Sequence, residues 1–331
     1  MGRVPFALVT VLLTAVALMS SLTDPARATD ALTPSQLAAD LRAAEQVRRV
    51  PANLQPPIAR ARSAVPAISE NGCRLGRAGV WKKPCIYGDA ASHTSVVVFG
   101  DSHAGMWFPA LNLISKQQHW RLIDLTKSGC PAVDVNLGVW FLNGALYSAC
   151  NQWRATAMAH IAALHPAFVI VSWARWLEAP EALPTPGIPT GHGSPWEDGV
   201  AAAFDFLRHA AKRVIFISDI PTLPESAPGC LADHISDVQA CTVSQTAATP
   251  LAAVKASELE LARREGIGAI DPTSWFCAET RCPLIVDNLL IYQDNSHMTR
   301  EWSRFLSPVL GAAILVLADT PLTSTAQGTI R

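Results

Sequence analysis

The sequence carries little charge, and its two signs nearly cancel. Only 16% of the 331 residues are charged, and 26 lysines and arginines stand against 27 aspartates and glutamates, a formal net charge of −1. This balance provides no basic field to gather phosphate groups, so nucleic acid is not an expected partner. Half of the residues are apolar. That is enough for a full core in one large domain or two small ones, and it argues against disorder.

Metal-site and nucleotide-site spacing is absent as well. Apart from His103 and His297, the histidines show no ligand-like spacing with one another or with acidic residues, so we expect no metal. The Gly-x-Gly at residues 191–193 lies in a proline-rich loop instead of between a strand and a helix, so it does not predict a nucleotide cofactor. No internal repeat occurs, and after residue 22 no segment is apolar enough to span a membrane.

Eight cysteines, an even and dispersed set, favour an oxidising compartment. They fall into sequence neighbours, and we expect these to pair, although eight cysteines allow many connectivities. A thiol nucleophile at Cys130 is the alternative, which is weaker because no histidine follows it locally. The expected bridges are Cys73–Cys85, Cys130–Cys150, Cys230–Cys241 and Cys277–Cys282.

The N-terminus indicates export. Arg3 precedes an apolar run over residues 4–22, and Ala26-Arg27-Ala28 has the small-x-small pattern that signal peptidase cleaves. We therefore expect a signal peptide over residues 1–28 and a secreted, periplasmic or envelope-associated protein. The alternative is an uncleaved membrane anchor, because the run approaches the roughly 20 residues that span a bilayer.

The remaining chain divides into a lead segment, a main domain and a tail. Residues 29–70 contain a predicted helix over 34–49, capped by Thr33 or Ser35, and a proline-rich bridge over 51–66 that lies on the surface of the main domain. We expect the main domain over residues 71–320 and a flexible tail over 321–331.

Strand and helix patterns alternate in the main domain. Strands separated by helices need crossover connections, which favour a parallel sheet covered on both faces. The sequence therefore predicts an α/β fold, a three-layer α/β/α sandwich with a parallel sheet of about five strands. The predicted strands are 95–99, 121–125, 167–172, 213–218 and 268–270, and the predicted helices lie near 104–118, 153–164, 196–211, 249–265 and 299–318.

Ser102 follows the first predicted strand of this domain, in Gly100-Asp101-Ser102, at the start of a helix. A serine at this junction has its hydroxyl at the carboxyl edge of the sheet and its amide at a positive helix end, which suits nucleophilic attack and oxyanion stabilisation. Helix capping by Ser102 explains the motif equally well.

Asp294 and His297 stand three residues apart just before the final predicted helix. A serine needs a base to take its proton, and the base needs a carboxylate to fix its tautomer. A surface turn is the alternative for any single Asp-x-x-His, but the pairing with Gly-Asp-Ser favours a Ser102–His297–Asp294 triad.

These two motifs resemble the first and last blocks of the SGNH hydrolase superfamily. More narrowly, VVVFGDSHAGMWFPAL, LTKSGCPAVDV, VSWARW and YQDNSHMT are similar to the SGNH domain fused to acyltransferase-3 membrane proteins of actinobacteria. The resemblance implies an SGNH/flavodoxin-like fold, with Ser102 as nucleophile, His297 as base and then acid, and Asp294 orienting His297. The chain resembles a freestanding version of this domain, without the membrane acyltransferase.

The resemblance also implies an oxyanion hole, and here the sequence departs from the superfamily. The amides of Ser102 and Gly129 match the pattern, but the third predicted strand lacks the usual asparagine block and continues instead as VSWARW. Arg175 is a candidate oxyanion donor or ligand for an acidic group, and a surface arginine packed on tryptophans is the alternative. Trp173, Trp176 and His103 are further candidates for substrate binding, with core packing as the alternative.

We therefore expect a serine-dependent O-acyltransferase or esterase acting on O-acylated envelope glycans or glycolipids. A separately encoded membrane acyltransferase is the expected acyl donor, and no cofactor is expected. The long loop over 178–196 is a candidate lid or acceptor-binding element. The alternative is a non-catalytic envelope glycan-binding protein, for which the missing asparagine block is the argument.

Overall fold

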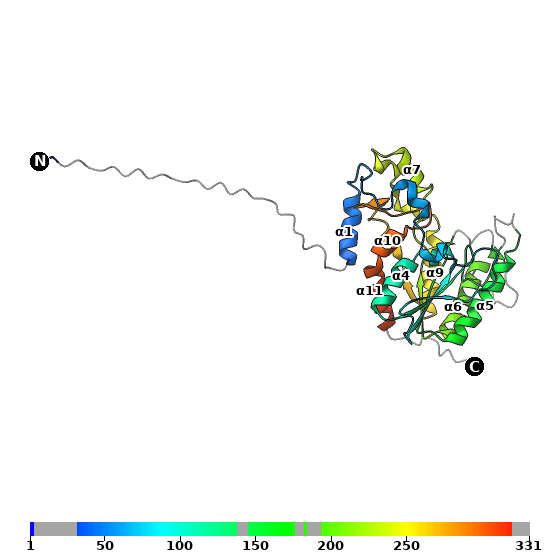
Figure 1. The fold of residues 1–331 in the computed structure, drawn as a ribbon. Helices are drawn as coiled ribbons and strands as arrows, with labels where there is room; N and C mark the ends of the chain where they lie inside the picture. The colour runs from blue at the N-terminus through cyan, green and yellow to red at the C-terminus, as the bar shows by residue number, and fades with distance from the viewer. Residues whose placement is uncertain (3–31, 138–144, 176–181, 184–192, 320–331) are drawn as a thin grey trace. The chain divides into compact units, whose positions relative to one another are not determined.

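A six-stranded sheet forms the centre of the protein, in a computed structural model that describes residues 1–2, 32–137, 145–175, 182–183 and 193–319 (Figure 1). The strand order is β1-β3-β2-β5-β7-β9. The four pairings from β3 across to β9 are parallel, whereas β1 runs antiparallel to β3. The strands are β1 Cys85–Gly88, β2 Ser95–Gly100, β3 Arg121–Thr126, β5 Phe168–Ser172, β7 Arg213–Ile217 and β9 Gly268–Ile270.

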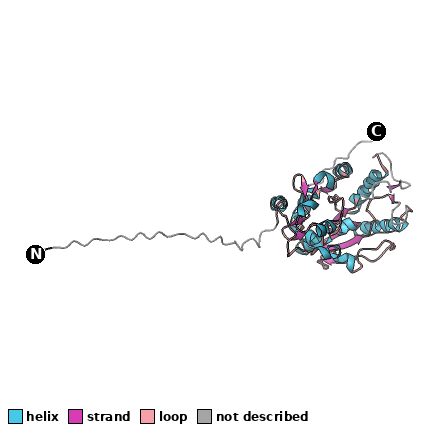
Figure 2. Cartoon of the chain, turned by 90° about the horizontal axis from the view of Figure 1, so that it is seen from above, coloured by secondary structure: helices cyan, strands magenta, loops and turns pink. Residues whose placement is uncertain are grey.

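Helices cover both faces of this sheet (Figure 2). Along β2, Val96 and Val98 belong to one hydrophobic cluster, and Val97 and Phe99 belong to the other, as the two-residue period of a strand requires. The first cluster takes in residues of α1 Pro34–Ala44, α4 Phe108–Gln117, α10 Arg300–Phe305 and α11 Ser307–Asp319. The second takes in residues of α5 Ser148–Leu164, α6 Pro195–Ala210 and α9 Ala252–Arg264.

Short elements connect this frame. Three antiparallel pairs join β4 Asn136–Leu137 with β6 Ala182–Leu183, β8 Val243–Ser244 with β10 Arg281–Cys282, and β11 Ile285–Val286 with β12 Leu289–Leu290. The short helices are η2 Ile58–Ser63, α2 Ala67–Glu70, α3 Ser102–Gly105, α7 Ala227–Asp233, η5 Val238–Cys241, α8 Gln245–Ala248 and η6 Pro272–Trp275.

The three-layer α/β prediction is confirmed, with one strand more than expected. The sequence analysis missed β1, a four-residue, partly exposed strand with no helix between it and β2. The helix predicted near 104–118 is interrupted, because α3 ends at Gly105 and Pro109 opens α4 within its first turn. In the same way the last predicted helix divides into α10 and α11 around Leu306, with Pro308 in the first turn of α11.

The lead segment packs against the core. Thr33 caps α1 with a capping box, as one of the two expected caps, and Leu37 and Leu41 of α1 are buried in the first cluster. The helix ends at Ala44, earlier than predicted, and the chain then reaches Ile235, whose carbonyl accepts from the amide of Val50. From Leu32 onward the described residues form one compact unit.

The expected signal or anchor run over residues 4–22 and the expected tail over 321–331 lie outside the described residues. Within the part of the chain that the structure describes, no helix is both long enough and apolar enough to cross a membrane.

Four disulfides join the cysteines as sequence neighbours. The bonds are Cys73–Cys85, Cys130–Cys150, Cys230–Cys241 and Cys277–Cys282, and no cysteine is left free. All eight cysteines lie in described segments. The pairing is consistent with export, because disulfides persist in oxidising compartments.

Candidate active site

The turn between β2 and α3 presents Ser102. Gly100 has φ +142°, and a Cβ at this position would lie 2.0 Å from the carbonyl oxygen of Ser172 on β5, so the turn requires glycine. Asp101 then caps α3 by accepting the amide of His103 at 2.7 Å. Ser102 is the first residue of α3 and is partly exposed. Because Asp101 is the cap of this helix, the hydroxyl of Ser102 does not cap it.

Ser102, His297 and Asp294 form a continuous hydrogen-bonded chain. His297 Nε2 lies 2.9 Å from Ser102 Oγ, and His297 Nδ1 lies 2.9 Å from Asp294 Oδ2. The other carboxylate oxygen, Asp294 Oδ1, accepts the amides of Ser296 and His297 at 2.8 Å each. This geometry lets the imidazole take a proton from the serine while the carboxylate holds its tautomer.

The carboxylate of Asp294 is strongly held in its ionised form. Burial alone raises its pKa, but the hydrogen bond from His297, the charge of that ring and the two amides outweigh burial and lower the pKa to about 2. Asp294 is therefore ionised throughout the neutral range. An ionised partner is what an imidazolium needs during proton transfer.

The amides of Ser102 and Gly129 are the candidate donors to an oxyanion. Among the described residues, neither amide donates a hydrogen bond. Gly129 adopts φ +63°, a left-handed conformation that favours glycine, in the turn that follows β3. Lys127 lies in the same turn, and its amide donates to the carbonyl of Gly100 at 3.0 Å. This bond connects the turn to the one that carries Ser102.

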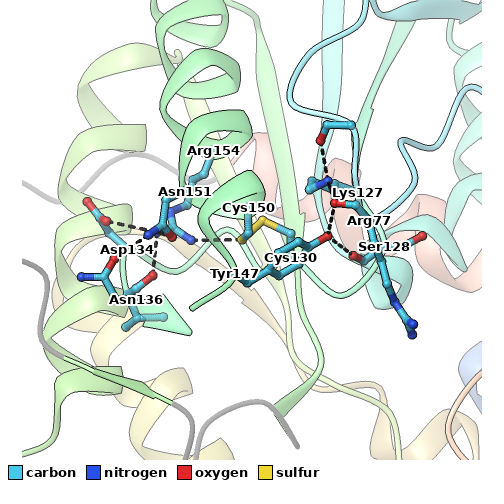
Figure 3. The surroundings of a disulfide bond; sticks show 12 residues. Arg77, Lys127, Ser128, Cys130, Asp134, Asn136, Tyr147, Cys150, Asn151 and Arg154 are labelled. Atoms are coloured by element: carbon cyan, nitrogen blue, oxygen red, sulfur yellow. Dashed lines mark hydrogen bonds and ion pairs between the residues drawn. A yellow bond between two sulfur atoms is a disulfide. The ribbon is translucent and has the colours of Figure 1, made fainter. Parts of the chain in front are cut away.

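Buried groups fix the turn that carries Gly129 (Figure 3). The ammonium of Lys127 donates to the carbonyls of Gly76, Arg77 and Gly79 at 2.8, 2.7 and 2.6 Å, so it clamps the segment 76–79 against this turn. The Tyr147 hydroxyl lies 3.0 Å from the carbonyl oxygens of Arg77 and Ser128. The Cys130–Cys150 disulfide joins the same turn to α5.

Two buried carboxylates hold the segment that follows β5. Asp101 Oδ2 accepts the amide of Ala174 at 2.9 Å, and Asp219 Oδ2 accepts the amide of Arg175 at 3.1 Å. Asp101 directly follows β2 and Asp219 lies two residues after β7, so the loops after the two strands that flank β5 supply these contacts. Burial raises the pKa of Asp101, and its hydrogen bonds and the charge of His103 offset this in part.

His103 is directed into the protein. Its side chain is 0% exposed, and its Nδ1 lies 2.6 Å from Asp219 Oδ1. The expectation that His103 contacts substrate is therefore corrected, since no part of the side chain reaches solvent. Trp173 is corrected in the same way, because it is fully buried, stacks on Phe216 at 4.6 Å and donates its indole N–H to Glu258 at 2.8 Å.

Arg175 is buried in an unusual environment. The residue is 4% exposed, and its Nε and Nη1 have no hydrogen-bond partner in the described structure. Its charge lowers the pKa of Asp219, although burial by itself raises it and His103 is the larger of the lowering causes. Arg175 is thus not the surface arginine of the alternative interpretation. Trp176 and most of the 178–196 loop lie outside the described residues.

The pair of His103 and Asp219 and the buried Glu258 were missed by the sequence analysis. The sequence does contain a pattern that indicates Asp219. Ile217-Ser218-Asp219 stands after one apolar strand as Phe99-Gly100-Asp101 stands after another. No local sequence pattern predicts a buried role for Glu258, which lies in the middle of α9. Among described residues no group of histidine, cysteine and acidic side chains has the arrangement of a metal site.

The fold and this site define an enzyme of the SGNH hydrolase type, which transfers acyl groups or hydrolyses esters. The chain belongs to the family described as SGNH domain (fused to AT3 domains), whose model matches residues 72–312.

Three solved structures are similar to this chain, and one of them has a TM-score above 0.5. The periplasmic domain of a lipopolysaccharide acetyltransferase from Salmonella ser. Paratyphi A is similar with a TM-score of 0.53 and 18% identity, over 75% of this chain and 88% of that one. An aryl esterase of M. smegmatis has a TM-score of 0.39 at 16% identity, over 68% of this chain and 99% of its own. An acetyl-xylooligosaccharide esterase from Geobacillus has a TM-score of 0.37 at 12% identity, over 70% and 97%. No curated protein sequence matches the chain.

Proposed function

We propose that this protein is an exported serine-dependent enzyme that transfers or hydrolyses acyl groups on envelope glycans or glycolipids. The single observation that carries the proposal is the chain of hydrogen bonds from Ser102 through His297 to Asp294. The four disulfides support export. The similar periplasmic domain belongs to a lipopolysaccharide acetyltransferase, which favours a glycan or glycolipid substrate.

The reaction begins with attack of Ser102 Oγ on the carbonyl carbon of an ester while His297 Nε2 takes the hydroxyl proton. In this mechanism the amides of Ser102 and Gly129 donate to the oxygen that becomes negative. When the intermediate collapses, His297 gives its proton to the departing alcohol and the acyl group stays on Ser102. An acceptor hydroxyl then attacks the acyl-enzyme, its proton passes to His297, and Ser102 leaves with that proton.

The acceptor decides whether the enzyme is an esterase or a transferase. Water gives hydrolysis, and a sugar hydroxyl gives O-acylation. We place the acceptor over the end of β5, between the segment 173–176 and the 178–196 loop. The support is Arg175, a guanidinium with two donors that find no partner among the described residues, and the indole of Trp176 as a surface for a sugar ring. A separate membrane acyltransferase would supply the acyl group.

A fluorophosphonate probe and a small activated ester test the nucleophile. We expect covalent labelling at Ser102, and a loss of ester turnover of about 10³-fold or more in Ser102→Ala and His297→Ala, with folding intact. Ser63→Ala, an exposed serine in η2, is the matched control and should keep wild-type turnover. Wild-type turnover in Ser102→Ala would refute the assignment. A protein that binds glycans but never reacts with the probe would establish the binding-protein alternative.

Comparing two reactions tests the acceptor site. Arg175→Ala and Trp176→Ala should reduce transfer to a glycan acceptor about 10-fold or more beyond any loss in hydrolysis of a small ester, because only transfer uses those contacts. Equal losses in both reactions would place Arg175 in the oxyanion hole. Product analysis across acyl donors and acceptors would identify the substrate pair.

A further inference from the structure

A positively charged segment runs along one edge of the sheet. Residues 71–88 contain four basic residues and no acidic one, whereas the whole chain has a formal net charge of −1. The segment ends in β1, the edge strand beside β3. The chain is therefore locally positive at this edge. The four basic residues are Arg74, Arg77, Lys82 and Lys83.

Large apolar side chains are exposed in the same segment. Seven such side chains are exposed in the part of the chain that the structure describes, and three of them fall within residues 80–86. Val80 is 43% exposed, Trp81 38% and Ile86 39%. Single exposed apolar residues are common on protein surfaces, but a group of them in so short a stretch is typical of an interaction surface. We call these three residues the edge patch.

Trp81 and Ile86 lie on the same side of the sheet. Ile86 pairs in register with Ile123 of β3, which belongs to the second hydrophobic cluster. The next residue, Tyr87, packs against α4 on the opposite face, as the two-residue period of a strand requires. The face of Ile86 is the one that α5 covers, and the ring of His160 on α5 lies beside Trp81 with centroids 5.6 Å apart. The edge patch is therefore one surface at the margin of α5.

The edge patch is held at both of its ends. The ammonium of Lys127 clamps the segment 76–79 against the turn that carries Gly129, and the edge patch begins with the next residue. At the other end, the Cys73–Cys85 disulfide and the pairing of β1 with β3 fix the chain. The edge patch is thus connected directly to the candidate active site.

The local charge argues against a second copy of this chain as the occupant. An exposed edge strand can pair with the same strand of another molecule. Such a pair would bring together two segments with four positive charges each, and like charges at close range repel each other. An anionic partner fits instead. A tryptophan and aliphatic side chains beside lysines are the combination that settles at the interface of a bilayer with anionic lipids, where the ring enters the headgroup region and the ammonium groups meet phosphates.

We propose that the edge patch, with Lys82 and Lys83, docks this protein on the surface of a bilayer that contains anionic lipids. The three apolar side chains enter the headgroup region, and the two lysines remain at the level of the phosphates. In the proposed function this docking keeps Ser102 near lipid-linked esters, and that role alone rests on the proposed function.

Binding to lipid vesicles tests the proposal. In sedimentation, the purified protein should bind vesicles of phosphatidylcholine mixed with phosphatidylglycerol, and about 10-fold or more weakly to phosphatidylcholine alone. High salt should weaken the binding. The double variant Lys82→Gln/Lys83→Gln should bind the mixed vesicles about 10-fold or more weakly, because each cation near such a surface contributes about fivefold. Glutamine keeps a donor for the carbonyl of Gly72, to which Lys82 donates.

Arg263→Gln/Arg264→Gln is the matched control. It removes the same charge from exposed positions at the end of α9, which packs on β9 at the opposite end of the sheet, and should change binding by less than about twofold. Residues 4–22 are the same in every variant, so differences in binding report on the edge patch. Equal binding by the Lys82→Gln/Lys83→Gln variant and the unmutated protein overturns the proposal.

Quenching by brominated lipids covers the case in which the lysine variants do not fold. Vesicles with bromine in the upper part of the acyl chains should quench the unmutated protein more than Trp81→Phe, because the indole of Trp81 reaches the bilayer. Equal quenching overturns the proposal. Binding to soluble heparin without binding to vesicles, or a dimer that Trp81→Ala dissociates, would also overturn it. Failure of the proposed function is recognised separately, because vesicle binding needs no turnover and fluorophosphonate labelling reports on Ser102 alone.

Discussion

Glu258 makes the stability of this protein depend on pH in an unusual direction. The residue is 1% exposed, and its Oε1 accepts the indole N–H groups of Trp173 at 2.8 Å and Trp196 at 3.0 Å. Its Oε2 has no partner in the described structure. Burial raises the pKa of Glu258 from 4.5 to about 7, against the lowering effects of the Trp173 bond and the Arg175 charge.

The raised pKa means that the folded protein binds this proton more tightly than the unfolded chain. The stabilisation is therefore fully present below about pH 4.5 and is lost as the pH rises through about 7. One pKa unit corresponds to about 1.4 kcal/mol, so a shift of this size contributes about 3 kcal/mol in full and about 2 to 3 kcal/mol between pH 5 and pH 8.

Glu258→Gln isolates this contribution. Glutamine keeps the volume and the oxygen that accepts both indoles, but it does not titrate. The free energy of unfolding of Glu258→Gln minus that of the unmutated protein should therefore increase by about 2 to 3 kcal/mol from pH 5 to pH 8. Urea denaturation with the disulfides intact, followed by tryptophan fluorescence at both pH values, measures this difference. Other titrating groups cancel because both proteins contain them.

Glu260→Gln is the matched control. It lies on the same helix, is exposed and forms an ion pair with Arg263, so its difference should change by less than about 0.5 kcal/mol. A difference for Glu258→Gln that is the same at both pH values, or smaller at pH 8, would refute the reasoning from burial.

The remaining predictions concern the turn that carries Gly129. Lys127→Met should lower the free energy of unfolding by about 2 kcal/mol or more and reduce kcat for a small ester, because three carbonyl oxygens lose the donor that holds the segment 76–79; exposed Lys116→Met should do neither. Retention of wild-type kcat would show that the clamp does not position the turn. Replacing Cys130 and Cys150 together by alanine opens a 20-residue loop and should cost about 3 kcal/mol in denaturant titrations. Thiol counting on the denatured, unreduced protein should find no free thiol, and two or more would contradict the four bridges.

The central strands could be predicted because burial on both faces leaves a continuous apolar run, as in Val96 to Phe99. Strand β1 could not be predicted in this way, since its four residues are partly or fully exposed and form no buried apolar run. The helix breaks at Met106 and Leu306 follow from prolines that the periodicity analysis passed over, Pro109 and Pro308.

In the candidate site, too, the sequence predicts some residues and misses others. Ser102 and the Asp294–His297 motif are local patterns at strand and helix ends, so the sequence predicts them as candidates. The pair of His103 and Asp219 is separated by 116 residues and exists only after the sheet brings the ends of β2 and β7 near each other. Trp173 and Arg175 were both candidates for substrate binding in the sequence. Only the hydrogen bond from Trp173 to Glu258 of α9 shows that Trp173 belongs to the core.

Hydrogen bonds to its backbone fix the path of the segment after β5. Asp101 and Asp219 accept hydrogen bonds from the backbone amides of Ala174 and Arg175. Every residue except proline has such an amide. The hydrogen bonds that hold this segment near Ser102 therefore do not depend on the identity of the side chain at either position, although both side chains are buried. A substitution at position 175 thus leaves in place the supports of the turns that carry Ser102 and Gly129, since the carboxylate of Asp101 and the ammonium of Lys127 bind backbone groups elsewhere.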